Sequence, residues 1–361
     1  MKKDLLIALA GVLCAFLAGM AILAAQGYDA PRGFMALIEY SLMSEMSFGG
    51  TLQRAAPLIL TGLSATVAFG SNAVNLGQLG QVLMGAMAVT TVGLVVDLPA
   101  PLMLPLLLAT AAIAGGLWCG IAAWLRNRFN MNEFISTLML NFLAEYFTLW
   151  MVRGPVKMTN ANTPMSPPIA DGGHLPALGS ISSSILVALV ALGGIYILWN
   201  RSRAGYEMRM MGLNPVFTRI GGCHNRENFT RAMMISGALA GLAGGLLIMG
   251  GIQHQFLIGI GGTYGWDGVM LAIIANCQVL ATSLYALLFA VLQNGALGME
   301  LETRVPSEFI MVFQAIIVLF VVASREVSRR LVNLLIARRV ASDALATTRQ
   351  PAEERVHGSV S

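Results

Sequence analysis

The sequence predicts an all-α, polytopic membrane protein with about ten transmembrane segments and both termini in the cytoplasm. Of its 361 residues, 56% are hydrophobic and only 11% are charged. Soluble domains carry about 25% charged residues, so this chain has too few charges to cover a surface in water. Apolar runs long enough to cross a bilayer recur from Leu5 to Ala323. Basic residues gather in the connections that lie on one side of these runs.

Ten segments have the composition of a membrane helix, which needs roughly 17–25 mostly apolar residues. They are 5–25, 52–69, 73–96, 99–124, 134–152, 181–199, 232–250, 266–278, 279–299 and 309–323. The first run could be a signal peptide, but it is longer than the usual apolar region and has no distinct cleavage site, so we expect a retained helix. Segment 266–278 is short enough for a re-entrant half-helix. Residues 34–48 carry Glu39 and Glu45, and we expect an interfacial helix there.

The distribution of basic residues supports ten spans. With the N-terminus inside, cytoplasmic segments hold 17 of the 22 lysines and arginines. A re-entrant segment 266–278 would instead leave an odd number of spans and place the basic C-terminal tail outside. We therefore divide the chain into a first transmembrane helix (1–30), a membrane core (31–325) and a basic, disordered cytoplasmic tail (326–361). Within the core, 153–180 is an external proline-rich loop and 201–231 is a cytoplasmic loop.

Polar side chains inside the predicted spans are mostly amides. Amides donate and accept hydrogen bonds without charge, which suits a path for a neutral hydroxylated solute. Hydrogen bonding between helices is the alternative for each of them. Glu145 is taken as the only carboxylate well inside a span, and a proton relay would need a chain of such groups. The candidate path residues are Asn75, Gln78, Gln81, Asn141, Glu145, Gln293 and Asn294.

The sequence contains no catalytic constellation. The four histidines and four cysteines have no metal-ligand or disulfide spacing, so we expect neither a metal nor a cofactor. No basic run with interleaved aromatic residues predicts a nucleic-acid partner. There is also no P-loop, so any nucleotide hydrolysis that drives the protein belongs to another polypeptide. The glycine-rich run 236–245 contains small-x-x-x-small patterns, which predict a helix-packing face.

The loop 201–231 holds six arginines and two glutamates. Membrane topology alone could explain that charge, and a plain solvated loop is the alternative interpretation. Its internal order indicates more. Residues 207–211 can form a short helix that Gly212 ends, and Asn214 with Pro215 can begin a second one. Two short helices joined by a fixed turn would make a rigid projection.

This loop resembles the cytoplasmic coupling motif of ABC importer permeases of the branched-chain amino acid, simple sugar and nucleoside group, which runs roughly G-x-E-x-R-A-x-G-x-N-P-x-A-A. Segment 132–141 is similar to the N-E-x-I-S-T-x-M-L-N signature of the nucleoside and simple-sugar branch, and 154–157 to the start of its external loop. Asn75-Leu76-Gly77 with Gln81 resembles its N-I-G-x-x-G-Q run. The residues that match the coupling motif are Gly205, Glu207, Arg209, Gly212, Asn214 and Pro215.

Two departures from the family pattern stand out. Val216, Phe217 and Thr218 replace alanine-rich positions after the Asn-Pro pair, where the partner would be read. Residues 276–278 (Asn-Cys-Gln) replace the usual glycine-containing turn between the last long spans. The first change affects partner pairing, and the second weakens any transfer of substrate identity.

The resemblance implies the permease subunit of an ATP-driven ABC importer in the inner membrane, carrying a nucleoside or simple sugar. The implied partners are cytoplasmic ABC ATPases, a second permease subunit that is identical or homologous, and an external solute-binding protein. In that mechanism Glu207 and Arg209 orient the coupling loop, and residues 212–215 set its turn. A stand-alone secondary transporter or facilitator for a small neutral solute is the alternative; a non-transporting scaffold and a membrane enzyme are less favoured.

Overall fold

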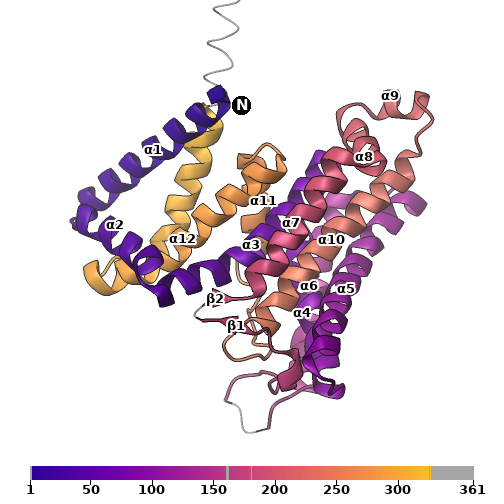
Figure 1. Ribbon diagram of the computed structural model, residues 1–361. Coiled ribbons are helices and arrows are strands. Elements are labelled where there is room, and N and C mark those ends of the chain that lie inside the picture. Colours follow the sequence, from indigo (N-terminus) through magenta and orange to yellow (C-terminus); the bar gives the residue numbers. More distant parts are fainter. Residues whose placement is uncertain (1, 160–161, 180, 325, 327–361) are drawn as a thin grey trace, which may run out of the picture. The chain divides into compact units, whose positions relative to one another are not determined.

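The structure is a computed structural model, and it describes residues 2–159, 162–179, 181–324 and 326. This part of the chain is mostly helical (Figure 1). It divides into two compact units, one made of residues 1–30 and 308–361, the other of residues 31–307. The predicted division at 30 and 325 therefore differs from the structural one, which groups the last apolar helix with the first. Residues 327–361 of the predicted tail lie outside the described part.

The smaller unit pairs the two ends of the apolar sequence. Helix α1 (Lys2–Ala25) packs against the helix Phe309–Ser324. The rings of Phe16 and Phe313 meet edge to face with their centroids 5.0 Å apart. Gly11 allows close contact, since a Cβ there would lie 3.0 Å from the Val321 Cα. The pairing joins helices almost 300 residues apart in sequence, and no local sequence pattern predicts it.

The larger unit contains the remaining helices and a two-stranded hairpin. Its elements are α2 (Ala30–Ile38), the π-helix η1 (Glu39–Met43), α3 (Glu45–Gly70), α4 (Gln78–Val95), α5 (Ala100–Phe129), α6 (Glu133–Arg153), the 3₁₀-helix η2 (Asp171–Gly173), β1 (Ala177–Leu178), β2 (Ile181–Ser182), α7 (Ser184–Arg201), α8 (Arg203–Leu213), α9 (Pro215–Ile220), α10 (Asn225–Met249), α11 (Tyr264–Ile274) and α12 (Val279–Thr303).

Each of the ten predicted spans overlaps a helix. In the described residues, seven helices are long and apolar enough to cross a membrane: α3, α4, α5, α6, α7, α10 and α12. Three shorter apolar helices occupy the other predicted spans: Gly11–Ala25 within α1, α11, and Phe309–Ser324. The predicted fold class, a polytopic helical membrane protein, is confirmed.

Helix α3 lies at the centre of the larger unit. It packs against α10, α11, α12 and α7, and all of its residues from Ala55 to Ala68 are buried. Helix α10 packs against α5 and α4 through its glycine-rich face. A Cβ at Gly241 would lie 2.8 Å from the Gly115 Cα, and one at Gly244 would lie 2.8 Å from the Val82 carbonyl carbon. The small-residue run is therefore the packing face that the sequence predicts.

Element boundaries differ from the prediction most clearly in two places. Residues 34–48 are not one interfacial helix: α2 and η1 end at Met43, and α3 begins at Glu45. Ser44 separates them, and its hydroxyl caps α3 by accepting a hydrogen bond from the Ser47 N–H. Span 73–96 begins only at Gln78, because residues 71–77 form a non-helical connection between α3 and α4.

The connections after α6 and α10 meet at the end of the unit that carries the hairpin (Figure 1). The His174 and His254 rings stack there with their centroids 3.7 Å apart. A backbone carbonyl holds each ring: the His174 Nε2 lies 3.2 Å from the Ile169 oxygen, and the His254 Nδ1 lies 3.2 Å from the Ile248 oxygen. Burial, followed by the charge on His174, lowers the pKa of His254. This packing therefore favours a neutral His254.

Candidate functional site

Helices α8 and α9 form a projection at the end of the larger unit opposite the hairpin (Figure 1). The Ser202 hydroxyl caps α8 by accepting a hydrogen bond from the Gly205 N–H at 3.0 Å. The Asn214 side chain caps α9 by accepting from the N–H groups of Val216 and Phe217, both at 3.0 Å. Pro215 occupies the first position of α9, where its missing N–H costs no hydrogen bond. The two predicted short helices are confirmed, and a fixed corner joins them.

The sequence predicts that Gly212 ends α8, and this prediction is wrong. The helix continues to Leu213, and Gly212 lies inside its last turn. The residue is small for another reason: a Cβ there would overlap the Gly70 carbonyl oxygen and lie 3.1 Å from the Gly70 carbonyl carbon. The last turn of α8 therefore rests directly on the end of α3.

Gly205 makes the equivalent contact with the preceding helix. A Cβ at this position would overlap the Leu198 carbonyl oxygen and lie 2.8 Å from the Trp199 Cα. Gly205 and Gly212 thus let the backbone of α8 lie directly against α7 and α3. Because no side chain separates the backbones at these two contacts, we expect a movement of α8 to move these helices too.

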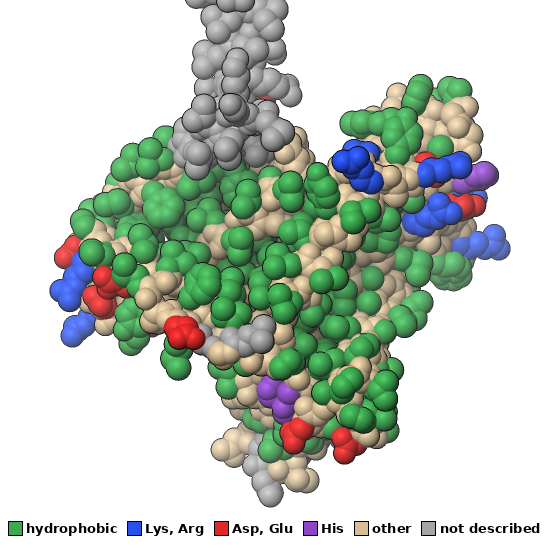
Figure 2. Space-filling model, in the orientation of Figure 1, with side chains coloured by type: hydrophobic (Ala, Val, Ile, Leu, Met, Phe, Trp, Pro, Cys, Tyr) green, Lys and Arg blue, Asp and Glu red, His purple; other side chains and the backbone are tan. Residues whose placement is uncertain are grey.

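The outer surface of the projection is apolar. Four large side chains of the α8–α9 corner and α9 are 60–81% exposed: Leu213, Val216, Phe217 and Ile220. Figure 2 shows green side chains at the tip of this projection and blue groups, with some red and purple ones, below it. Arg219 and Arg226, both exposed, belong to the same loop. A monomeric protein rarely exposes such a cluster on a rigid element unless a partner covers it.

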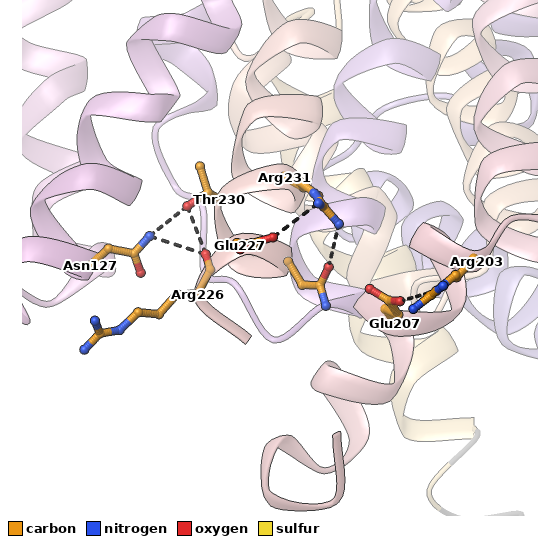
Figure 3. A network of polar contacts seen from close by, with 8 residues as sticks. Asn127, Arg203, Glu207, Arg226, Glu227, Thr230 and Arg231 are labelled. Carbon is orange, nitrogen blue, oxygen red and sulfur yellow. Dashed lines mark hydrogen bonds and ion pairs between the residues drawn. The ribbon is translucent and has the colours of Figure 1, made fainter. Parts of the chain in front are cut away.

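A network of polar contacts lies on α8 and at the start of α10 (Figure 3). The Arg203 Nε donates to the Glu207 Oε1 at 2.8 Å, and an Arg231 NH2 donates to the Glu227 Oε2 at 3.3 Å. The hydrogen bond from Arg203 is the largest of the influences that lower the pKa of Glu207. Asn228 is buried and accepts from Arg231 at 3.4 Å. Each of these bonds lies within α8 or within α10, and Asn228 and Arg231 also lower the pKa of Glu207, so the polar side chains of the two helices lie close together.

A cavity of about 390 Å³ lies within this network. Its lining residues come from α8, the turn after α9 and α10: Arg203, Ala204, Glu207, Gly222, Cys223, His224, Glu227, Asn228 and Arg231. Arg209, the other charged residue of the predicted coupling motif, lies apart from it. The Arg209 Nε is buried and makes no hydrogen bond within the described residues.

Four of the predicted path residues gather around the connection between α3 and α4. The Asn75 Nδ2 donates to the Gln81 Oε1 at 3.0 Å and to the Ser236 hydroxyl at 2.8 Å. The Gln81 Nε2 donates back to the Asn75 Oδ1 at 2.9 Å. In its hydrogen-bonding orientation, Gln78 accepts from the Ala65 N–H and donates to the Gly265 oxygen, both at 2.9 Å. These buried amides therefore hold α3, α4, α10 and α11 together.

The polar residues of the signature 132–141 contact the same connection. Asn132 caps α6, and Glu133 forms an ion pair with Arg126 at the end of α5. The Thr137 hydroxyl accepts from the Leu76 N–H at 3.2 Å. One turn later, the Asn141 Oδ1 accepts from the Gly80 N–H, and its Nδ2 donates to the Leu76 oxygen, both at 2.8 Å. One face of α6 thus supplies hydrogen-bond partners to the non-helical connection at Leu76 and to the first turn of α4 at Gly80.

The remaining path candidates lie elsewhere. Asn294 on α12 donates to the Ser47 oxygen at 2.9 Å, and Gln293 donates to the Asp267 Oδ2 at 2.9 Å. Glu145 lies one turn beyond Asn141 on α6, but its side chain is exposed and has no ion-pair partner among the described residues. The structure brings together Asn75, Gln78, Gln81 and Asn141, and it keeps Glu145, Gln293 and Asn294 apart from them.

Asp267 is a second carboxylate inside an apolar helix, which corrects the view that Glu145 is the only one. It lies in the first turn of α11 and is 2% exposed. Its Oδ2 accepts from the Thr263 hydroxyl at 2.7 Å as well as from Gln293. A single acid within the apolar segment 264–274 was the available signal, but its partner on α12 could not be identified from sequence.

Comparison with known proteins agrees with this architecture. Residues 47–322 match the family described as branched-chain amino acid transport system / permease component. The chain is 34% identical over 334 residues to a guanosine ABC transporter permease protein of Bacillus subtilis, covering 89% of this chain and 94% of that protein. It is 31% identical to a glucose ABC transporter permease protein of Haloferax volcanii, covering 91% and 90%. A nucleoside ABC transporter permease protein of Lactococcus lactis is 29% identical, covering 88% and 91%. No solved structure matches the chain.

Proposed function

Because the chain belongs to the family of branched-chain amino acid transport system permease components, and is thus the membrane-spanning permease subunit of an ABC transporter, we propose that it imports a nucleoside or a simple sugar across the inner membrane. Two cytoplasmic ABC ATPases drive the transport, a second permease subunit completes the membrane domain, and an external binding protein delivers the solute. ATP hydrolysis takes place on the ATPases and not on this chain.

The apolar surface of the α8–α9 projection is the observation that carries the coupling proposal. Leu213, Val216, Phe217 and Ile220 form the surface that enters a groove on the ATPase, and the surrounding arginines contact its rim. Burial of these four side chains supplies the affinity, since such large apolar side chains contribute about 1.5–3 kcal/mol each when fully buried. The departure at residues 216–218 gives this surface its own pairing specificity.

The coupling motif acts through rigid contacts. Closure of the ATPases on ATP moves α9, and the Asn214 cap transmits the motion to α8. The glycine contacts then pass it to α7 and α3, while the packing of α8 against α10 passes it to α10. Glu207 orients the projection through its proximity to Asn228 and Arg231 of α10, and Arg209 supports it through its buried Nε. Each step is a contact between packed elements, which is how a small displacement is carried across a protein.

The proposed solute follows from the amides and the relatives together. Amide-rich helices suit a neutral solute with many hydroxyl groups, and the similar permeases are named for glucose, guanosine and nucleosides. The amides at Asn75, Gln78, Gln81 and Asn141 already make hydrogen bonds within the bundle. We therefore propose that they mainly shape the path, and that the solute can use only those of their donors and acceptors that have no partner in the bundle. Gln293 and Asn294 complete the proposed set on α12.

The coupling proposal is tested by assembly. The permease is co-expressed with its ATPase subunits, and co-purification is compared between the wild type and Ile220→Asp, which places a charge on the apolar surface. We expect the ATPases to be lost from Ile220→Asp. The control is Val190→Asp on the exposed face of α7: permease molecules of this variant that insert into the membrane should still co-purify with the ATPases. Retention of the ATPases by Ile220→Asp would refute docking at this surface.

A further inference from the structure

Glu145 lies at a depth where a carboxylate is costly in lipid. It stands about 18 Å along α6 from Glu133 and about 12 Å from Arg153, at a rise of about 1.5 Å per residue. Since a bilayer's hydrocarbon core is about 30 Å thick, this position is well inside it. A carboxylate in the middle of a span faces the bundle interior or a water-filled cavity in nearly all membrane proteins.

The bundle of this chain does not enclose Glu145. The side chain is exposed, and the described residues offer it neither an ion-pair partner nor a side-chain hydrogen bond. Aromatic side chains are exposed beside it on the same helix: Phe142 is 54% exposed, Tyr146 70% and Trp150 59%. Leu143 (57%) and Met139 (55%) are exposed on the same helix as well, so the face is mixed aromatic and aliphatic, and the carboxylate is the feature that a lipid-facing surface avoids.

The exposed face of α7 provides the contrast. Val190 lies near the middle of this helix and is 77% exposed; its exposed neighbours Leu186, Leu189 and Ile197 are aliphatic, and Tyr196 near the end of the helix is 39% exposed. Such a face is what lipid contact requires. The two helices are equally apolar candidates for spans, yet only α6 carries a charge on its open side.

We propose that Glu145 stands on the wall of the water-filled solute path, where it binds O–H and N–H donors of a neutral solute and repels anions. This inference rests on the proposed transport function and narrows its substrate class to uncharged or cationic solutes, excluding phosphorylated ones. The carboxylate accepts hydrogen bonds from sugar hydroxyls or base amino groups. The neighbouring rings pack against the apolar face of the sugar or base.

The charge preference can be measured without the binding protein. In a chain whose four native cysteines are replaced by serine, Phe142→Cys places a thiol one turn from Glu145. The complete transporter is treated with a cationic trimethylammonium or an anionic sulfonate methanethiosulfonate, and the two labelling rates are compared. We expect the ratio of cationic to anionic rates to fall about tenfold when Glu145→Gln is added, because a charged cleft concentrates ions of opposite sign. Val190→Cys serves as the lipid-facing control.

Two results would overturn the proposal. One is Phe142→Cys labelling no faster than Val190→Cys, which would place this face of α6 in lipid or in a dry contact. The other is a rate ratio that Glu145→Gln leaves unchanged. In the same variants without added cysteines, solute uptake should fall about tenfold for Glu145→Leu but stay within about threefold of the wild type for Glu145→Gln, which keeps an acceptor. Because labelling needs no ATP, uptake that proved independent of the ATPases would refute the proposed function and leave this inference standing.

Discussion

Replacing Gly212 with leucine should separate ATP hydrolysis from transport. Gly212 is the point where α8 rests on the end of α3, and a Cβ there would overlap the Gly70 carbonyl oxygen. The nearest carbons, those of Gly70 and Ser71, would lie at 3.1 and 3.2 Å. Because apolar contacts prefer about 3.5–4.0 Å, α8 must move away from α3 by about 1 Å to accept even the first carbon of the side chain.

This displacement sets the size of the effect. Forcing extra carbon atoms into a packed contact costs about 1–3 kcal/mol. If that cost falls on the docked arrangement of α8, the population of the coupled state drops about 5- to 150-fold. The seven long apolar helices are not altered, so membrane insertion and the amount of protein should stay near the wild-type level.

The assay measures two rates on the same preparation. The transporter is reconstituted with its ATPases, and ATP hydrolysis and solute uptake are followed together. We expect the uptake per ATP hydrolysed to fall at least about fivefold in Gly212→Leu. The matched control is Gly221→Ala at the end of α9, where a Cβ would meet its nearest atom, the Thr218 oxygen, at an ordinary 3.5 Å. Unchanged coupling in Gly212→Leu, or equal loss in the control, would refute the contact as the transmission point.

Three further predictions address other parts of the account. Phe217→Asp should abolish co-purification of the ATPases while the detergent-purified permease keeps its wild-type melting temperature; ATPase retention would contradict the docking surface. Asn75→Leu should destabilise the permease by about 2 kcal/mol or more in thermal unfolding, because the buried Gln81 and Ser236 lose their hydrogen bonds to that amide. The control Asn200→Leu, at an exposed position, should change the stability little. His254 has a lowered pKa, so its neutral form adds stability above the unfolded pKa of about 6.5 that is lost as the pH falls below it. Melting temperatures from about pH 7 to about pH 5 should therefore fall more for the wild type than for His254→Phe, which keeps a ring stacked on His174; equal pH dependence would exclude His254 as the cause.

Much of the fold could be predicted because its signals are local. An apolar run of about 20 residues needs no knowledge of its neighbours to be recognised as a membrane helix. The cap at Asn214 is equally local, since an amide followed by proline starts a helix wherever it is placed. The pairing of α1 with Phe309–Ser324 is different, because two apolar helices carry no sequence signal for each other.

The site was harder to predict, since its residues act through distant partners. Gly212 looks like a helix terminator in isolation, and only the position of Gly70 reveals that it is a contact point. The hydrogen bonds of Asn141 go to a backbone 61 and 65 residues away. In sequence, Glu145 and Asn141 are both polar residues one turn apart in the same apolar span. In the structure Glu145 is exposed and Asn141 is buried.

The most direct test of the central claim is ATP-dependent uptake in proteoliposomes. The permease is reconstituted with its ATPase and second permease subunits, solute-loaded binding protein is supplied outside, and uptake of labelled nucleoside or sugar is measured with and without internal ATP. The account predicts uptake only when ATP and the ATPases are present, and loss of that uptake with Ile220→Asp. Equal uptake by this chain alone, without ATP, would contradict it and identify a stand-alone transporter.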